Sequence, residues 1–200
     1  MSGHVVRILY LALACLHLGI GGAESQESDF PVDPTAIERP RMRAVRVEGP
    51  IEIDGRLDDA EWQRATPAGG VWIQTIPGMG MPATERTEVR ILYDDENLYF
   101  GARLYQSDDV VFPGLGQDYD VANSDAFGIA VDTYHDRQNG FLFAVNPGGA
   151  VVDAQSFNDR RDVAIAWEGV FDVRTQISDS SWVVELAIPF ATLRFNPIDR

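Results

Sequence analysis

Hydrophobic and polar residues alternate with a period of two along most of the chain after residue 43. Because successive side chains of a β-strand point to opposite faces of a sheet, this alternation predicts strands with one buried face. The alternating runs lie at 45–53 (interrupted by Pro50), 88–93, 98–105, 126–131, 141–145 and 183–188. Turn-forming clusters separate them. The pattern predicts an all-β fold, an antiparallel β-sandwich of the jelly-roll or immunoglobulin-like kind.

One short segment has helical spacing instead. Asp58 and Glu61 have the spacing of a capping box, Trp62 lies on the apolar face that follows, and Pro67 is a stop signal. We therefore expect one short helix of about two turns. A further turn is predicted over 189–193, because proline suits the first position of a helix.

The N-terminus has the composition of a secretory signal peptide. Arg7 precedes an apolar run over 8–20, and small and then polar residues follow it. That run is shorter than the roughly 20 residues that a membrane-spanning helix needs. We expect residues 1–23 to be a signal peptide, 24–42 a proline-containing linker and 43–200 the folded domain, with a C-terminal continuation missing from its abrupt end. The protein is accordingly expected to be exported, to the periplasm, the outer membrane or the outside of the cell.

Charge and composition exclude several classes of protein. The formal net charge is −15 and every basic residue other than histidine is arginine, so the chain is expected to repel phosphate backbones and to bind no nucleic acid. Its one cysteine, Cys15, falls within the predicted signal peptide, which leaves no disulfide or thiolate site in the domain. His135 is the one histidine beyond that peptide, which disfavours most zinc enzymes and catalytic triads.

Four segments carry motifs in a fixed order. They are IDGRLDDAEW at 53–62, ERTEVRILYDDENLYFGARLY at 85–105, the SDAFGIAVD and GFLFAVNPGG stretches within 124–153, and WVVELAIPFATLRF at 182–195. Together they resemble the family 9 carbohydrate-binding modules, over about residues 45–195. The resemblance implies a β-sandwich that binds saccharide, and a domain that is itself non-catalytic although the family is associated with hydrolases acting on O-glycosyl bonds.

The resemblance also bears on the partner of this domain. The nearest branch of the family carries the domain just after the signal peptide, ahead of a long second half predicted to be an outer-membrane β-barrel. It implies a covalent C-terminal partner of that kind.

A sugar site needs flat aromatic faces and a few orienting polar groups. Trp62 and Trp182 are predicted to lie in the core. The candidate carbohydrate-binding residues are Trp72, Trp167, Tyr134, Arg137 and Arg160. For Trp72 and Trp167, core packing and ligand contact are equally open.

Family 9 modules are known for bound calcium, so the resemblance implies a calcium site. Its candidate ligands are Asp125, Asp132 and Asp153, which lie within the matched motifs and offer the oxygen atoms that calcium prefers. Asp125 and Asp132 lie at opposite ends of one predicted strand and cannot share an ion by themselves. No pair of carboxylates stands out as catalytic, so no catalytic residue is assigned.

The sequence thus predicts a carbohydrate-binding module of an exported cell-envelope protein, associated with carbohydrate uptake or catabolism. Three alternatives are open. The domain is a structural docking or plug domain for a barrel, or part of an O-glycosyl hydrolase, or a haem-binding module with His135, Met42, Met79 or Met81 as axial ligands.

Overall fold

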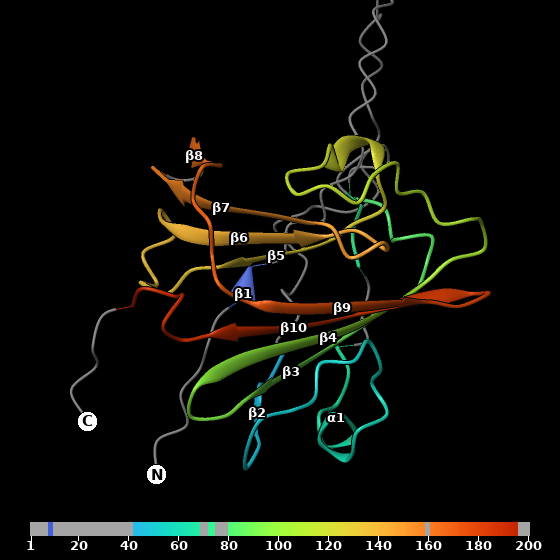
Figure 1. Cartoon of the computed structure of the whole chain (residues 1–200), viewed down its shortest axis with the longest axis horizontal. Helices are drawn as coiled ribbons and strands as arrows, with labels where there is room; N and C mark the ends of the chain where they lie inside the picture. Colours follow the sequence, from blue (N-terminus) through green and yellow to red (C-terminus); the bar gives the residue numbers. More distant parts are fainter. Residues whose placement is uncertain (1–7, 10–41, 69–71, 75–79, 159–160, 196–200) are drawn as a thin grey trace, which may run out of the picture.

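Two five-stranded sheets lie one above the other in the computed structural model of the chain (Figure 1). The structure describes residues 8–9, 42–68, 72–74, 80–158 and 161–195. The upper sheet has the order β1-β5-β6-β7-β8 and the lower sheet the order β2-β3-β4-β10-β9. The predicted all-β sandwich is therefore confirmed.

The elements have the following bounds. The upper sheet contains β1 (Ile8–Leu9), β5 (Phe127–Val131), β6 (Gly140–Val145), β7 (Val151–Phe157) and β8 (Asp162–Ala164). The lower sheet contains β2 (Val45–Arg46), β3 (Thr87–Tyr93), β4 (Asn97–Tyr105), β9 (Asp172–Ile177) and β10 (Ser181–Pro189). The helices are α1 (Ala60–Arg64) and the 3-10 turn η1 (Val121–Asn123). Neither helix is long and apolar enough to cross a membrane, and the same holds for the whole described part of the chain.

The strand pairings are antiparallel among the described residues, except that β2 runs parallel to β3. The predicted signal peptide and linker lie outside the described residues apart from Met42 and the β1 pair Ile8–Leu9, which lies antiparallel to β5. The order of the strands makes β10 a central strand, and its side chains are buried from Ser181 to Ile188.

The main core lies between the two sheets. Alternate side chains of β5 and β6 are buried there, as the period of two predicts. Its large members come from both sheets: Leu98, Phe100, Phe143, Trp182, Leu186 and Ile188. Each such side chain, once fully buried, contributes about 1.5–3 kcal/mol of hydrophobic stabilisation.

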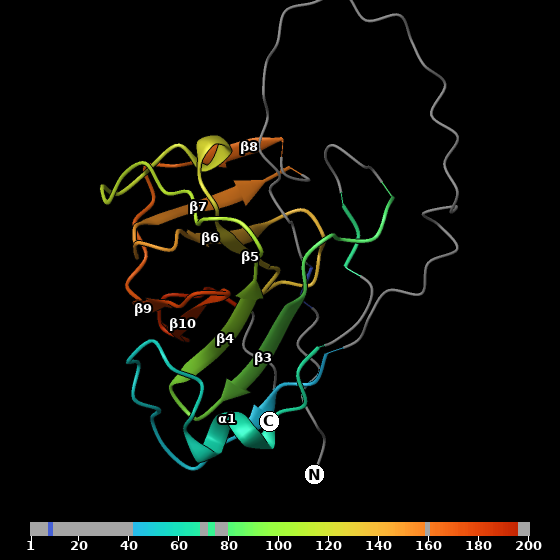
Figure 2. The same cartoon turned by 90° about the vertical axis from the view of Figure 1, so that its right-hand side faces the viewer.

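A second, smaller core covers the outer face of the lower sheet, where α1 lies below the strands (Figures 1 and 2). Trp62 of α1 is completely buried there, as predicted. Gly101 of β4 makes room for it, because a Cβ at that position would lie 2.5 Å from Leu57 Cδ2 and 2.9 Å from the Trp62 ring. The close approach of helix and strand thus depends on a glycine in mid-strand.

Glu185, on β10, connects this outer layer to the sheet. The side chain is fully buried. Its Oε2 accepts hydrogen bonds from the backbone N–H groups of Asp54 (2.9 Å), Gly55 (2.6 Å) and Arg56 (3.1 Å), and its Oε1 accepts one from Trp62 Nε1 (2.7 Å). Burial raises the pKa of Glu185 above its ordinary value, although these four donors oppose the rise. One buried carboxylate thus fixes the 54–56 turn and the helix to the sheet.

Several local predictions are wrong or incomplete. The helix begins at Ala60 after Asp59, which makes no side-chain cap, so the predicted capping box at Asp58 does not form. The predicted turn over 189–193, by contrast, is confirmed: the Thr192 N–H donates a hydrogen bond to the Pro189 carbonyl. The sequence pattern missed β7, β8 and β9, and the predicted 45–53 strand is confirmed only at β2. The edge strands β8 and β9 expose most of their side chains, so they show no clean buried face.

Replacement of Glu185 by glutamine should destabilise the domain. A glutamine offers one acceptor oxygen and turns an NH₂ group toward the remaining buried donors, so at least one N–H loses its partner. The expected loss in free energy of unfolding is about 2–4 kcal/mol, measured by urea denaturation followed by tryptophan fluorescence.

The matched control is Asp179→Asn, in the exposed turn before β10. It should change the free energy of unfolding by less than about 0.5 kcal/mol. A Glu185→Gln variant as stable as this control would contradict the structural role of Glu185.

Candidate functional site

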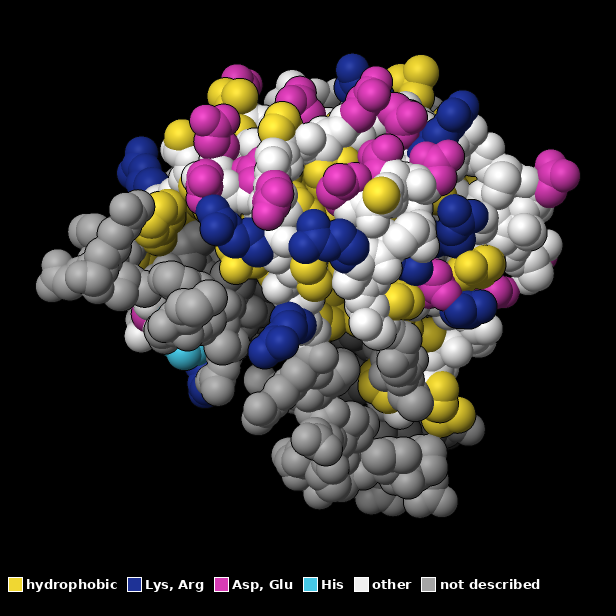
Figure 3. Space-filling model, turned by 90° about the horizontal axis from the view of Figure 1, so that it is seen from below, with side chains coloured by type: hydrophobic (Ala, Val, Ile, Leu, Met, Phe, Trp, Pro, Cys, Tyr) yellow, Lys and Arg dark blue, Asp and Glu magenta, His cyan; other side chains and the backbone are white. Residues whose placement is uncertain are grey.

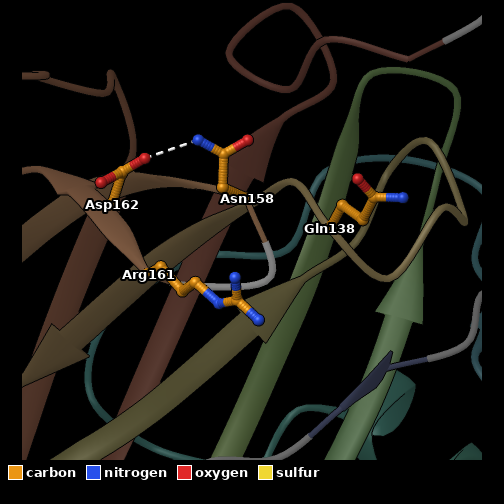
Figure 4. A pocket seen from close by; sticks show the side chains of 4 residues that line it. All are labelled: Gln138, Asn158, Arg161 and Asp162. Atoms are coloured by element: carbon orange, nitrogen blue, oxygen red, sulfur yellow. Dashed lines mark hydrogen bonds between the residues drawn. The ribbon is translucent and has the colours of Figure 1, made fainter.

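One end of the upper sheet gathers the exposed groups best suited to bind a small polar ligand. β6 and β7 are paired from Gly140 opposite Ser156, so two segments lie side by side: the β5–β6 loop (132–139) and the described ends of the β7–β8 turn, Asn158 and Arg161. We call these two segments and the hollows beside them the loop end. An open hollow of about 480 Å³ is lined there by Gln138, Asn158, Arg161 and Asp162 (Figure 4).

A smaller hollow of about 90 Å³ lies against the same strands. Its lining includes the aromatic residues Tyr134, Phe141 and Phe157, together with Arg194. Tyr134 and Phe157 are 38% and 39% exposed, so part of each ring is accessible to a ligand. The loop end therefore presents apolar ring surface next to amide, carboxylate and guanidinium groups.

The polar groups of the larger hollow differ in whether they are already hydrogen-bonded to one another. Asn158 Nδ2 donates to Asp162 Oδ2 at 2.5 Å, which uses one oxygen of that carboxylate. Figure 4 shows the guanidinium group of Arg161 extending from the turn toward the side of Gln138, away from Asp162. The hollow thus presents hydrogen-bond donors from two segments that are far apart in the sequence.

The β5–β6 loop is fixed by its own carboxylates. Asp132 accepts from the backbone N–H groups of Asp136 and Arg137, and Asp136 accepts from the N–H groups of Gln138 and Asn139. The hydrogen bonds from Asn139 and Gln138 hold the pKa of Asp136 below its ordinary value. These contacts tie the backbone of the loop to its own carboxylates.

Backbone strain is concentrated at this end of the sheet. His135, Arg137 and Asn158 have φ angles of 56°, 61° and 52°, in the left-handed region that non-glycine residues seldom occupy. Such strain often accompanies a functional site, because the surrounding structure must maintain it.

The predicted sugar-binding residues are distributed over several elements. Tyr134 and Arg137 lie at the loop end, and Arg160 lies outside the described residues. Trp72 donates from Nε1 to the Thr87 carbonyl at the start of β3 (2.8 Å). Trp167 lies over β6, with its ring centroid 5.0 Å from that of Phe141. Both tryptophans pack against the main core and remain partly exposed, so each has at least a structural role.

Sequence reasoning missed Gln138, Asn158 and Phe157, which the structure adds to the site. The sequence marks Gln138 as part of a turn cluster, and nothing in its spacing relates that turn to Asn158. Their proximity follows from the pairing of β6 with β7.

The three candidate calcium ligands do not meet. Asp125 precedes β5 and accepts from the Val111 N–H, Asp132 follows β5 within the loop end, and Asp153 lies inside β7. The described residues contain no group of three or more metal-ligating side chains. These three aspartates therefore do not fit a shared calcium ion, and calcium binding elsewhere in the domain stays a prediction.

Asp153 has a structural role instead. It is buried, and its Oδ2 accepts from the Gly169 N–H at 2.5 Å, which holds the 165–171 segment and Trp167 against the upper sheet. Burial raises the pKa of Asp153, the Gly169 hydrogen bond opposes the rise, and the charges of Asp118 and Glu168 add to it. The net pKa lies above the ordinary value.

The face below the lower sheet carries both signs of charge. Figure 3 shows arginine side chains interspersed with aspartate and glutamate there. Arg86 forms an ion pair with Glu88, whose other oxygen lies 3.6 Å from Arg90 Nη1. This mixture differs from the basic stripe that binds a phosphate backbone.

The pKa of Asp153 sets the pH dependence of an Asp153→Asn variant. Because the pKa of Asp153 is higher in the folded state than its ordinary value of 3.8, protonation of this carboxyl group favours the folded state. That contribution to stability is fully present below pH 3.8 and is lost as the pH rises through the folded pKa. Asparagine still accepts from Gly169 and does not titrate. The wild type should therefore lose stability relative to the variant as the pH rises above 3.8, as measured by urea denaturation. A relative gain over the same range would contradict the assignment.

Comparisons with known proteins agree with this architecture. Residues 53–199 match the family model described as carbohydrate family 9 binding domain-like. No curated protein matches the chain.

Solved structures share the fold. A family 9 carbohydrate-binding module from Caldicellulosiruptor kristjanssonii in complex with cellotriose is 21% identical, with a TM-score of 0.51, over 73% of this chain and 66% of that one. Its complex with glucose matches at 19% identity and a TM-score of 0.51, over 78% and 72%. A candidate carbohydrate-binding protein from Bacteroides uniformis matches at 12% identity and a TM-score of 0.60, over 78% and 75%. Since the family model covers well over half of the sequence, the chain belongs to the carbohydrate family 9 binding domain-like family.

Proposed function

We propose that this domain binds a saccharide at the loop end. The observation that supports it most is the pair of half-exposed rings, Tyr134 and Phe157, next to the polar hollow of Gln138, Asn158 and Arg161. The C–H face of a pyranose ring packs on an aromatic ring, while its hydroxyl groups need donors and acceptors at the edge. Members of the same family have been solved with cellotriose and with glucose, which supports a saccharide as the class of ligand.

The geometry favours recognition without catalysis. Asp132 and Asp136 accept hydrogen bonds from the backbone of their own loop, and Asp162 accepts one from Asn158. A glycosidase needs one carboxyl group as an acid and a second as a base or nucleophile, both directed at the bond to be cut. Carboxylates that hold their own loops serve to position the recognition groups instead.

We further propose that the module serves an exported protein that takes up or degrades carbohydrate. The order of basic, apolar and small residues in 1–23 supports export. A binding domain of this kind gains its biological effect by holding a covalently attached partner close to a polysaccharide, since attachment raises the partner's effective concentration.

Alanine variants of the two exposed rings test the site. The chain would first be screened against an array of plant and bacterial oligosaccharides, and affinities for the hits would be measured by calorimetry. Tyr134→Ala and Phe157→Ala should each weaken binding about tenfold, because each removes one ring contact.

The matched control is Leu115→Ala. Leu115 is 70% exposed and contacts the Gly148 turn at the opposite end of β6, so its removal should leave the affinity unchanged. Full affinity in both ring variants would place the site elsewhere. Failure of the folded chain to bind any saccharide would overturn the proposed function.

A further inference from the structure

Three guanidinium groups at the loop end, those of Arg137, Arg161 and Arg194, have no hydrogen-bond or ion-pair partner within the described part of the chain. Arg161 lines the larger hollow, Arg194 lines the smaller one, and Arg137 lies in the β5–β6 loop between Asp136 and Gln138. No ion pair or side-chain hydrogen bond joins any of their guanidinium groups to another described residue. Elsewhere, by contrast, Arg46 pairs with Asp95 and Arg86 with Glu88.

The nearby carboxylates are occupied by neutral donors. Asp132 and Asp136 each accept two backbone N–H groups of the loop, and Asp136 also accepts from Asn139 Nδ2. Asp162 accepts from Asn158 Nδ2. Asp132 and Asp136 thus accept hydrogen bonds within their own loop and Asp162 accepts one through Oδ2, while the three guanidinium groups are exposed.

We propose that the ligand of the loop end is an acidic sugar, a saccharide with a ring carboxylate, and that Arg161 binds this carboxylate. The inference rests on the saccharide-binding function proposed above and specifies its ligand. The planar guanidinium group donates two parallel hydrogen bonds that match the two oxygens of a carboxylate. The side-chain amide of Gln138 and the side-chain Oδ1 of Asn158 supply the donors and acceptors for neighbouring hydroxyl groups of the sugar.

The charge of the whole chain limits the size of this ligand. With a net charge of −15, the domain repels a long polyanion beyond the loop end. Repulsion between exposed charges decays within about 8–10 Å at physiological salt. A short or sparsely charged oligosaccharide fits these conditions. Its carboxylate would reach Arg161, while its uncharged sugar rings lie against Tyr134 and Phe157.

Calorimetry with matched ligands tests the inference. The 200-residue chain would be titrated with trigalacturonic acid and with a glucuronic-acid-substituted xylotriose, each compared with its methyl ester. The ester keeps the ring and the linkage and removes the charge. At least one acid should bind about tenfold more tightly than its ester, and the difference should shrink as salt is added.

Substitutions assign the difference to a residue. Arg161→Gln should bring acid and ester to equal affinity, and Arg161→Lys should restore only part of the difference because lysine lacks the fork. The matched control is Arg174→Gln on β9, whose guanidinium group donates to the Val173 carbonyl in the lower sheet. It should keep the full preference, and circular dichroism should show an intact fold in all three variants.

Three outcomes would overturn the inference. Equal affinity for acid and ester in both pairs would contradict an acidic ligand, and a preference for the acid that survives Arg161→Gln would contradict the role of Arg161. Either result would leave the proposed saccharide binding intact. A sulfated oligosaccharide that binds as tightly as the carboxylate would make the site a general anion site. Absence of binding to every saccharide would overturn the inference and the proposed function together.

Discussion

The hydrogen bonds of the buried Glu185 carboxylate hold the 54–56 turn and α1 against the outer face of the lower sheet, and this outer layer depends on them. Glu185 lies on the central strand β10 and accepts four hydrogen bonds from groups that are about 130 residues earlier in the sequence. A charge in this position is costly, and the cost is offset only because every donor is in place. The same contacts bring Trp62 onto Gly101, so the helix and the sheet form one unit. β10 in turn supplies core side chains such as Trp182 and Leu186 that support the upper sheet.

The main strands were predictable from the sequence because they obey a simple rule. β3, β4, β5, β6 and β10 alternate buried and less buried positions or carry long apolar runs. The role of Glu185 was not predictable, because a polar residue within a strand ordinarily faces water, and here α1 covers that face. β7 was missed because it buries Asp153 and Ser156 among its apolar residues. A buried polar side chain can be recognised only when its partners from other segments are known.

The candidate site was predictable in part. Tyr134 was chosen as an aromatic face and Arg137 as an orienting polar group, and both lie at the loop end. Asn158, Phe157 and Arg161 join them only through the pairing of β6 with β7, which is a long-range property of the fold. The three aspartates chosen as calcium ligands share sequence motifs without sharing a place in space, because motif residues often hold loops and strands together. Asp132 and Asp153 have that structural role here.

Nuclear magnetic resonance tests most directly whether saccharide binds at the loop end. A ¹⁵N-labelled sample would be titrated with the tightest saccharide found, and amide shift changes would be mapped on the structure. If saccharide binds there, the largest changes should fall on the β5–β6 loop and the β7–β8 turn, including Gln138 and Arg161, while the amides of Asp54 and Gly55 stay unchanged. Changes centred on Trp72 and the start of β3, with the loop end unaffected, would contradict it.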